Sequence, residues 1–194
     1  MKFKSERLHL VKFSENLLDE RIMSWFQDAN LMKYYTNSKT EISKDILLEY
    51  INRGIVNKDN FTYFIVHTDT DNIIGTIKVG PINKIHNSSD LVTLIGDSRR
   101  YGKGIGTEAI ALGIKLAFEK YDIRKLFGGM YASNIASIKA YTRAGWIVEG
   151  ILTGHYLNNG NNEDRILVGC FNPNYFTKEE ILKAKFDKWY DEQE

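Results

Sequence analysis

The chain has 194 residues, 43% of them hydrophobic and 26% charged, which is typical of one globular domain. It carries 26 Lys and Arg against 25 Asp and Glu, and a net charge of +1 gives no general attraction to nucleic acid. One Cys excludes an internal disulfide, and together with four scattered His it argues against a zinc site. Neither a signal-peptide start nor an apolar run of membrane-spanning length occurs. We therefore expect a cytoplasmic domain over residues 1–194, with no metal, nucleic-acid or membrane partner.

The first part of the chain predicts one strand and two helices. Residues 7–13 alternate apolar and polar side chains, which is the pattern of a half-buried strand. Apolar residues then recur at helical spacing in two segments, one with Ser14 as its N-cap and one that begins at Ser43. Residues 32–40 between them are aromatic and polar, and they predict a loop.

The rest of the chain predicts six further strands, separated by turns and helices. The strands are expected at residues 61–67, 73–79, 91–95, 125–131, 146–157 and 165–171. An Asn- and Gly-rich turn at 158–162 joins the last two as a hairpin, and Pro81 marks the end or edge of an earlier one. Helices are expected at 107–121, at 134–144 and, after a capping-box start, at 177–192. The order indicates a mixed α and β fold around one sheet, with residues 173–194 as a C-terminal helical extension.

A glycine-rich turn between a predicted strand and the longest helix carries the first functional signal. In Tyr101-Gly102-Lys103-Gly104-Ile105-Gly106-Thr107-Glu108, three alternate glycines let backbone N–H groups approach a bulky anion. The following helix adds the positive end of its dipole, and neighbouring Arg and Lys side chains add charge. The segment lacks the order of a Walker A loop, and Thr107 stands where a dinucleotide fingerprint needs a third glycine. An anion site is therefore expected, with a ligand-free turn as the alternative.

This turn resembles the coenzyme-binding motif of the GNAT superfamily of acetyltransferases, in which Arg or Gln precedes the pattern x-x-Gly-x-Gly/Ala. Gly104 and Gly106 match the two small positions, whereas Tyr101 stands where Arg or Gln is usual. Residues 134–146 are similar to the superfamily's Asn-x-x-Ala/Ser…Tyr-x-Lys-x-Gly-Phe segment, with Arg for the usual Lys and Trp for the usual Phe. The opening of the chain resembles the branch that acetylates ribosomal-protein N-termini, polyamines and amino sugars. Two motifs in this order are more specific than either alone.

The resemblance implies the GNAT fold, an α+β arrangement whose mostly antiparallel, twisted sheet has about seven strands and one splayed parallel pair. About four helices flank this sheet, and a C-terminal helix follows. It also implies that acetyl-CoA is the cosubstrate and that a primary amine attacks it directly in a ternary complex. Coenzyme contacts are then expected from Leu94, Ile95, Asp97, Gly102, Lys103, Gly104, Ile105, Gly106, Thr107, Asn134 and Ser137.

Two residues are candidates for proton transfer. In the family, a tyrosine at the position of Tyr141 gives a proton to the departing thiolate, and the pKa values of a thiol, about 8.5, and a phenol, about 10, suit this step. The amine must lose a proton before it attacks, and Asp90 is the first candidate for the base, at the start of a strand expected beside the acetyl group. An ordinary Asp is a weak base, so this role requires burial or a water relay. A packing role for Tyr141 and a solvated strand end for Asp90 are the alternatives.

The sequence defines the acceptor less well than the donor. Candidate acceptor-binding residues occur in the aromatic loop, before residue 91 and on the last hairpin: Tyr34, Tyr35, His86, His155 and Glu163. Aromatic faces beside polar groups suit an amino sugar or a nucleotide-linked amino sugar, so we expect a small-molecule amine as partner. The lack of a long acidic run argues against spermidine. A protein N-terminus is the rival acceptor, and a non-catalytic acyl-CoA-binding module is the rival function. We expect a monomer or a homodimer.

Overall fold

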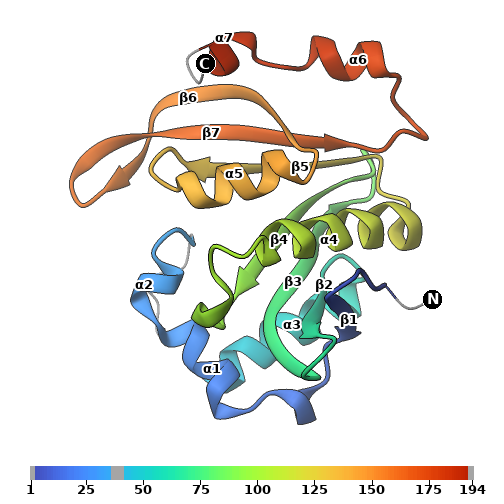
Figure 1. Ribbon diagram of the computed structural model, residues 1–194, viewed down its shortest axis with the longest axis vertical. Coiled ribbons are helices and arrows are strands. Elements are labelled where there is room, and N and C mark those ends of the chain that lie inside the picture. Colours follow the sequence, from blue (N-terminus) through green and yellow to red (C-terminus); the bar gives the residue numbers. More distant parts are fainter. Residues whose placement is uncertain (1–2, 36–41, 192–194) are drawn as a thin grey trace.

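The computed structural model describes residues 3–35 and 42–191, and it contains one seven-stranded sheet (Figure 1). The strands are β1 (Leu8–Lys12), β2 (Phe61–His67), β3 (Asn72–Asn83), β4 (Ser88–Ile95), β5 (Lys125–Tyr131), β6 (Ile147–Asn158) and β7 (Asn161–Phe171). Their order in the sheet is β1-β2-β3-β4-β5-β7-β6. Only β4 and β5 run parallel among these neighbours, which confirms the mostly antiparallel sheet and its parallel pair. β6 and β7 form a long curved hairpin at one end of the sheet (Figure 1).

Helices cover both faces of this sheet. They are α1 (Glu20–Gln27), α2 (Ala29–Met32), α3 (Lys44–Asn57), α4 (Ile105–Tyr121), α5 (Ile135–Arg143), α6 (Lys178–Lys183) and α7 (Asp187–Asp191). Strand β2 shows why two layers form, because its apolar side chains alternate between the two faces. Tyr63 and Ile65 join the core beneath α4 and α5, whereas Phe64 and Val66 join a second core with α1, α2 and α3.

Two helix boundaries differ from the sequence expectation. The helix expected from Ser14 is a short 3₁₀ turn followed by α1, because the side chain of Asp19 accepts a hydrogen bond from Ile22 N (2.7 Å) and caps the helix there. The single helix expected at 177–192 is wrong, since α6 and α7 are separate. Phe186 lies between them, packs against the core and donates its N–H to Val148 O of β6 (2.9 Å). Part of the loop expected at 32–40 lies outside the described residues.

The parallel pair β4 and β5 is short, and this shortness positions the site. Residues 88–90 pair with residues 125–127, and beyond Asp90 and Phe127 the two strands separate. The predicted strand start at residue 91 is therefore wrong, because the polar residues 88–90 already belong to β4. Ser89 is fully buried, and its hydroxyl donates to the carbonyl of Asp90 (2.9 Å), so it enters the strand without an unsatisfied group. Asp90 consequently lies at the vertex of the splay.

Among residues 3–35 and 42–191, no helix combines the length and the apolar character that a membrane crossing requires. Within the same described residues, no three His, Cys, Asp or Glu side chains gather closely enough to hold a metal ion.

Candidate active site

A groove of about 850 Å³ opens where β4 and β5 have separated. Its walls are the end of β4, the glycine-rich turn, the first turn of α4, helix α5 and the segment from α1 to Tyr35. Most of the predicted coenzyme residues line this groove: Leu94, Ile95, Gly102, Gly104, Ile105, Gly106, Thr107, Asn134 and Ser137. Two motifs that are distant in sequence therefore meet at one site.

The glycine-rich turn presents the start of α4 to the groove. Gly104, the N-cap of α4, has a left-handed φ of +75°, and Gly102 has a φ of +73°. Side chains rarely tolerate this conformation, which explains both glycines. A Cβ at Gly106 would meet no described atom within 4 Å, so the space beside the backbone of Gly106 is open to a ligand. No side chain caps α4, and its first N–H groups, at the positive end of the helix dipole, can receive an anion.

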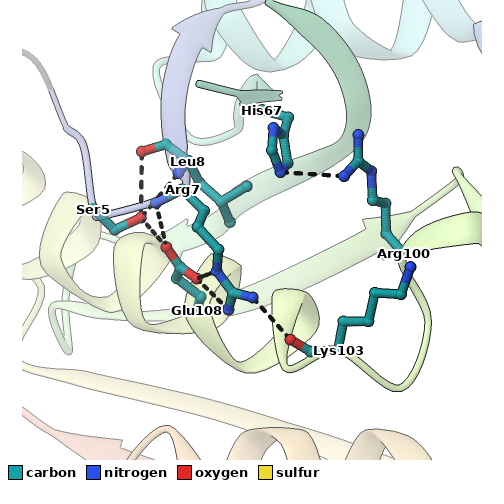
Figure 2. Close-up of polar contacts among 7 residues, drawn as sticks. All are labelled: Ser5, Arg7, Leu8, His67, Arg100, Lys103 and Glu108. Carbon is teal, nitrogen blue, oxygen red and sulfur yellow. Dashed lines mark hydrogen bonds and ion pairs between the residues drawn. The ribbon is translucent and has the colours of Figure 1, made fainter. Parts of the chain in front are cut away.

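A cluster of hydrogen bonds fastens the turn to the N-terminal segment (Figure 2). The carboxylate of Glu108 accepts from Ser5 Oγ (2.6 Å), from the backbone N–H of Arg7 (2.9 Å) and from Arg7 Nε (2.7 Å). The same guanidinium donates through Nη1 to the carbonyl of Lys103 (2.9 Å). Burial acts to raise the pKa of Glu108, but the hydrogen bonds from Ser5 and Arg7 hold this pKa below its usual range. Arg7 thereby links α4 to the middle of the turn.

Asp97 and Lys103 do not line the groove, although coenzyme contacts were expected from both. Asp97 caps a 3₁₀ turn over residues 98–100, where its carboxylate accepts from Arg99 N (3.2 Å) and Arg99 Nε (2.8 Å). Hydrogen bonding from Arg99 lowers the pKa of Asp97 despite the opposing effect of burial. Asp97 is therefore built into the turn, and Lys103 offers its carbonyl to Arg7.

Two arginines that line the groove were not among the predicted site residues. Arg143 ends α5, and its place at the Lys position of the second motif was the available signal. Arg100 was noted only for its charge. Its Nη1 donates to His67 Nε2 (3.2 Å), while its Nε is buried without a hydrogen-bond partner (Figure 2). Both guanidinium groups bring positive charge to the groove that holds the α4 N-terminus.

Tyr141 reaches from α5 to the splayed part of β4. Its side chain is buried, and its hydroxyl donates to the carbonyl of Leu91 (2.8 Å). The ring of Trp146 packs edge-on against it, with 4.9 Å between the centroids. Burial raises the pKa of Tyr141, so the phenol stays protonated and retains a proton that it can donate. Asn134 caps the same helix and accepts a long hydrogen bond from Ser137 N (3.4 Å), as expected for an N-cap.

Asp90 lies at the vertex of the splay, next to the hydroxyl end of Tyr141. Burial raises the pKa of its carboxyl group, and the charges of Lys78 and Arg165 oppose this effect only in part. Its negative charge in turn raises the pKa values of Tyr35, Tyr141 and Tyr156 beyond the effect of their own burial. A carboxylate with a raised pKa is a stronger base than an ordinary Asp, which meets the requirement stated from the sequence.

Tyr34 and Tyr35 connect the segment after α2 to both splayed strands. The hydroxyl of Tyr35 donates to Thr93 O of β4 (3.0 Å), and the hydroxyl of Tyr34 donates to Ser133 O after β5 (3.3 Å). Both tyrosines line the groove. These two consecutive residues, which the sequence predicted as acceptor-binding residues in an aromatic loop, thus connect the two splayed strands.

Tyr34 also begins a row of aromatic rings that leads onto the last hairpin. Its ring lies 5.6 Å from that of Tyr131, and Tyr131 stacks on Tyr156 at 3.9 Å. His155 contacts Tyr156 edge-on at 5.1 Å. We call Tyr34, Tyr131 and Tyr156 the tyrosine wall. Tyr131 and Tyr156 were not among the predicted site residues, since neither lies in a motif. Only the pairing of β7 with both β5 and β6 brings them together.

The other predicted acceptor residues have different surroundings. Glu163 accepts from Ser133 N (2.7 Å) and from Asn158 Nδ2 (2.6 Å), and these hydrogen bonds lower its pKa although burial opposes them. Its carboxylate therefore holds the hairpin against the loop after β5. His86 lies in the turn before β4, whereas the groove opens beyond the other end of the paired residues. The fold brings Tyr34, Tyr35, His155 and Glu163 to one end of the sheet and leaves His86 at the opposite end.

A family model and a curated relative each match most of the chain. Residues 7–147 match the family model described as "Acetyltransferase (GNAT) domain". The probable N-acetyltransferase YjcK of Bacillus subtilis is 28% identical over 171 residues, which cover 86% of this chain and 92% of that protein.

Solved structures also share the fold. Spermidine N-acetyltransferase from Vibrio cholerae, determined in complex with CoA and spermine, superposes with a TM-score of 0.77 at 22% identity, covering 89% of this chain and 100% of that one. The ribosomal-protein-S5-alanine acetyltransferase from Vibrio fischeri gives a TM-score of 0.73 at 19% identity, covering 91% and 100%.

Proposed function

The chain belongs to the GNAT family of acetyltransferases, and we propose that it transfers an acetyl group from acetyl-CoA to the primary amine of a small molecule, with an amino sugar or a nucleotide-linked amino sugar as the best-fitting acceptor. One observation carries this proposal. The uncapped N-terminus of α4 lies in the wall of the groove. The groove opens where β4 and β5 separate, and Asp90, whose carboxyl pKa is raised, lies where this separation begins. The buried Tyr141 hydroxyl donates to the splayed part of β4.

The residues of the groove fit the coenzyme. The free N–H groups at the start of α4 suit the pyrophosphate, and the open space at Gly106 allows the phosphates to approach the backbone. Arg100 and Arg143 supply charge to the same groove. Leu94 and Ile95 line the groove at the end of β4, where strand pairing with β5 has ended and backbone groups can pair with the pantetheine arm. The coenzyme supplies the activated acetyl group.

Asp90 and Tyr141 divide the proton transfers between them. Asp90 accepts a proton from the ammonium group of the acceptor, directly or through water, and the neutral amine then attacks the acetyl carbonyl carbon. A C–N bond forms and the C–S bond breaks, and the attacking nitrogen loses its second proton to solvent, which replaces the proton that Tyr141 donates. Tyr141 supplies the proton that the departing sulfur needs, from a hydroxyl that lies on the carbonyl of Leu91. The raised pKa of Asp90 makes it a better base. The raised pKa of Tyr141 keeps the phenol protonated before the reaction, although it also makes the phenol a weaker acid toward the departing sulfur.

The charges near Asp90 favour an amine with a single positive charge. Lys78 and Arg165 act on Asp90 from β3 and β7, and the carboxylate of Glu163 is held by two hydrogen bonds. A polyamine requires several free carboxylates along its length, which these residues do not provide. The tyrosine wall offers the flat aromatic faces on which sugar rings stack. The spermidine and S5-alanine acceptors belong to relatives too distant to transfer their substrates to this chain.

A panel of amines tests the proposal. The purified chain is incubated with acetyl-CoA and glucosamine, a UDP-linked amino sugar, spermidine or an alanine-terminated peptide, and free thiol is measured. We expect the highest kcat/KM among the sugar amines, at least about tenfold above the others, because selective sites commonly discriminate by this factor. Higher kcat/KM for spermidine or for the peptide would refute the acceptor assignment. The cytoplasmic location and the monomeric or homodimeric state stay predictions.

A further inference from the structure

Arg165 is a cation on the acceptor side of the sheet without a carboxylate partner. It lies on β7, opposite Tyr131 of β5 and Leu152 of β6. Its side chain is half-buried, and its Nε is fully buried with no hydrogen-bond partner. Within residues 3–35 and 42–191, Arg165 forms no ion pair with any carboxylate, although Asp90 is near enough for the two charges to interact. Buried donors and charges in proteins are normally satisfied, so this group calls for an explanation.

The surroundings of Arg165 hold its guanidinium flat against the sheet. The group lies directly over Gly129 of β5, where a Cβ would collide with it. On its other side it faces the ring of Tyr156, with 5.8 Å between Cζ and the ring centroid. Nη1 donates to His155 Nε2 (3.3 Å). The side chain is thus positioned by a glycine, an aromatic ring and a histidine, none of which neutralises its charge.

A cation in this place acts against the reaction if the acceptor carries only an ammonium group. Arg165 opposes the rise in the pKa of Asp90 and so weakens the base, and Lys78 acts in the same direction. Both charges also repel an ammonium group that approaches Asp90. Lys78 has a partner, since its Nζ donates to the hydroxyl of Tyr50 (3.0 Å). Arg165 likewise donates to a group without negative charge, His155 Nε2 (3.3 Å), but its buried Nε has no hydrogen-bond partner among the described residues. A negative group on the acceptor removes both disadvantages at once.

We propose that Arg165, together with His155, binds an anionic group carried by the acceptor, a phosphate or a carboxylate, while the amine of the same molecule reaches Asp90. Guanidinium binds both anions through paired N–H donors, and His155, whose Nε2 accepts from Arg165 Nη1, offers its Nδ1–H as a further donor. The tyrosine wall lies beside this anion site, so a sugar ring stacks between the two recognised ends. The inference rests on the proposed function and narrows it to amino sugars that are phosphorylated, nucleotide-linked or acidic.

Matched acceptors test this inference. Wild-type enzyme is assayed with glucosamine, glucosamine 6-phosphate, a UDP-linked amino sugar and 2-amino-2-deoxygluconate, which separate the neutral, phosphate and carboxylate arms. We expect kcat/KM to be about 10- to 100-fold higher for at least one anionic acceptor than for glucosamine, as for other charge-assisted contacts. Arg165→Gln abolishes this preference, so that kcat/KM for the anionic acceptors falls to the value that the same variant gives with glucosamine. Arg165→Lys keeps the positive charge but lacks the paired N–H donors of the guanidinium, so it retains only part of the preference.

Two controls keep the outcome interpretable. Arg53→Gln removes an exposed arginine of α3 outside the groove and leaves the preference intact. The affinity for acetyl-CoA, measured by calorimetry, stays unchanged in Arg165→Gln if that variant is folded. Inorganic phosphate competes with the amine in the wild type and not in Arg165→Gln. Equal kcat/KM values for neutral and anionic acceptors, or a preference that survives Arg165→Gln, overturn this inference and leave the proposed function standing. Absence of turnover on every amine overturns the proposed function itself.

Discussion

Glu108 does not line the groove, yet we predict that its loss weakens coenzyme binding. Glu108→Ala removes the acceptor of three hydrogen bonds, from Ser5 Oγ, Arg7 N and Arg7 Nε, and leaves the Arg7 guanidinium with only the Lys103 carbonyl (Figure 2). The turn is then no longer fastened through Arg7 to α4. The coenzyme must order the turn as it binds, and this ordering costs affinity.

The magnitude follows from the contacts. The carboxylate is 16% exposed and the Arg7 side chain 38% exposed, so the ion pair is screened by water and contributes less than a buried one. If this exposure reduces each of the three hydrogen bonds to about 1 kcal/mol, the free energy of unfolding falls by about 3 kcal/mol. We expect the Kd for acetyl-CoA to rise by about 3- to 30-fold, since only part of that free energy concerns the order of the turn.

Calorimetric titration with acetyl-CoA and thermal unfolding measure the two effects. Glu119→Ala is the matched control, because Glu119 is an exposed carboxylate on the same helix. The pKa of Glu108 is lowered in the folded state, so its stabilisation is present above the unfolded pKa of about 4.3 and is lost as pH falls through the lower folded value. The difference in Tm between the wild type and Glu108→Ala therefore narrows in acid. An unchanged Kd together with a clear fall in Tm would refute the link between this cluster and the coenzyme.

Three further predictions concern the groove itself. Gly104→Val forces a β-branched residue into a left-handed φ of +75° and should raise the Kd for acetyl-CoA at least about tenfold. Gly160→Val is equally strained, at a φ of +83° in a distant hairpin turn, and should leave this Kd unchanged. Similar Kd values for both variants would contradict the role of the glycine-rich turn. Tyr141→Phe should lower kcat by roughly 10²–10⁴-fold with little change in coenzyme affinity, and a fully active variant would reduce Tyr141 to packing. For Asp90, kcat/KM should rise with pH through an apparent pKa above that of an ordinary Asp, because the carboxylate is the active form. Asp90→Asn should remove this acidic limb along with most of the rate, and a variant that keeps the wild-type pH profile would exclude Asp90 as the base.

The local parts of the fold were predictable because they depend on neighbouring residues. The apolar run of β2, the long apolar helix α4 and the Asn- and Gly-rich turn between β6 and β7 can all be read from neighbouring residues. The glycine-rich turn was found for the same reason, since left-handed backbone at Gly102 and Gly104 and the helix start after them involve consecutive residues. These features were sufficient to predict where the groove proposed for the coenzyme lies.

Three features that the sequence did not predict depend on contacts between distant segments: the break between α6 and α7, the start of β4 and the surroundings of Arg165. The break between α6 and α7 depends on Phe186 meeting Val148 of β6, and no pattern within residues 177–192 signals it. The start of β4 at Ser88 depends on its pairing with β5, which comes later in the chain. Arg165 reaches Gly129 and Tyr156, and acts on Asp90, only because β7 lies between β5 and β6 in the sheet. Sequence periodicity reports which face of an element is apolar, whereas strand order determines which polar side chains meet. The sequence by itself therefore predicted the acyl donor. Only the tertiary structure placed the Arg165 guanidinium, which forms no ion pair with a carboxylate among the described residues, beside Asp90, the candidate base.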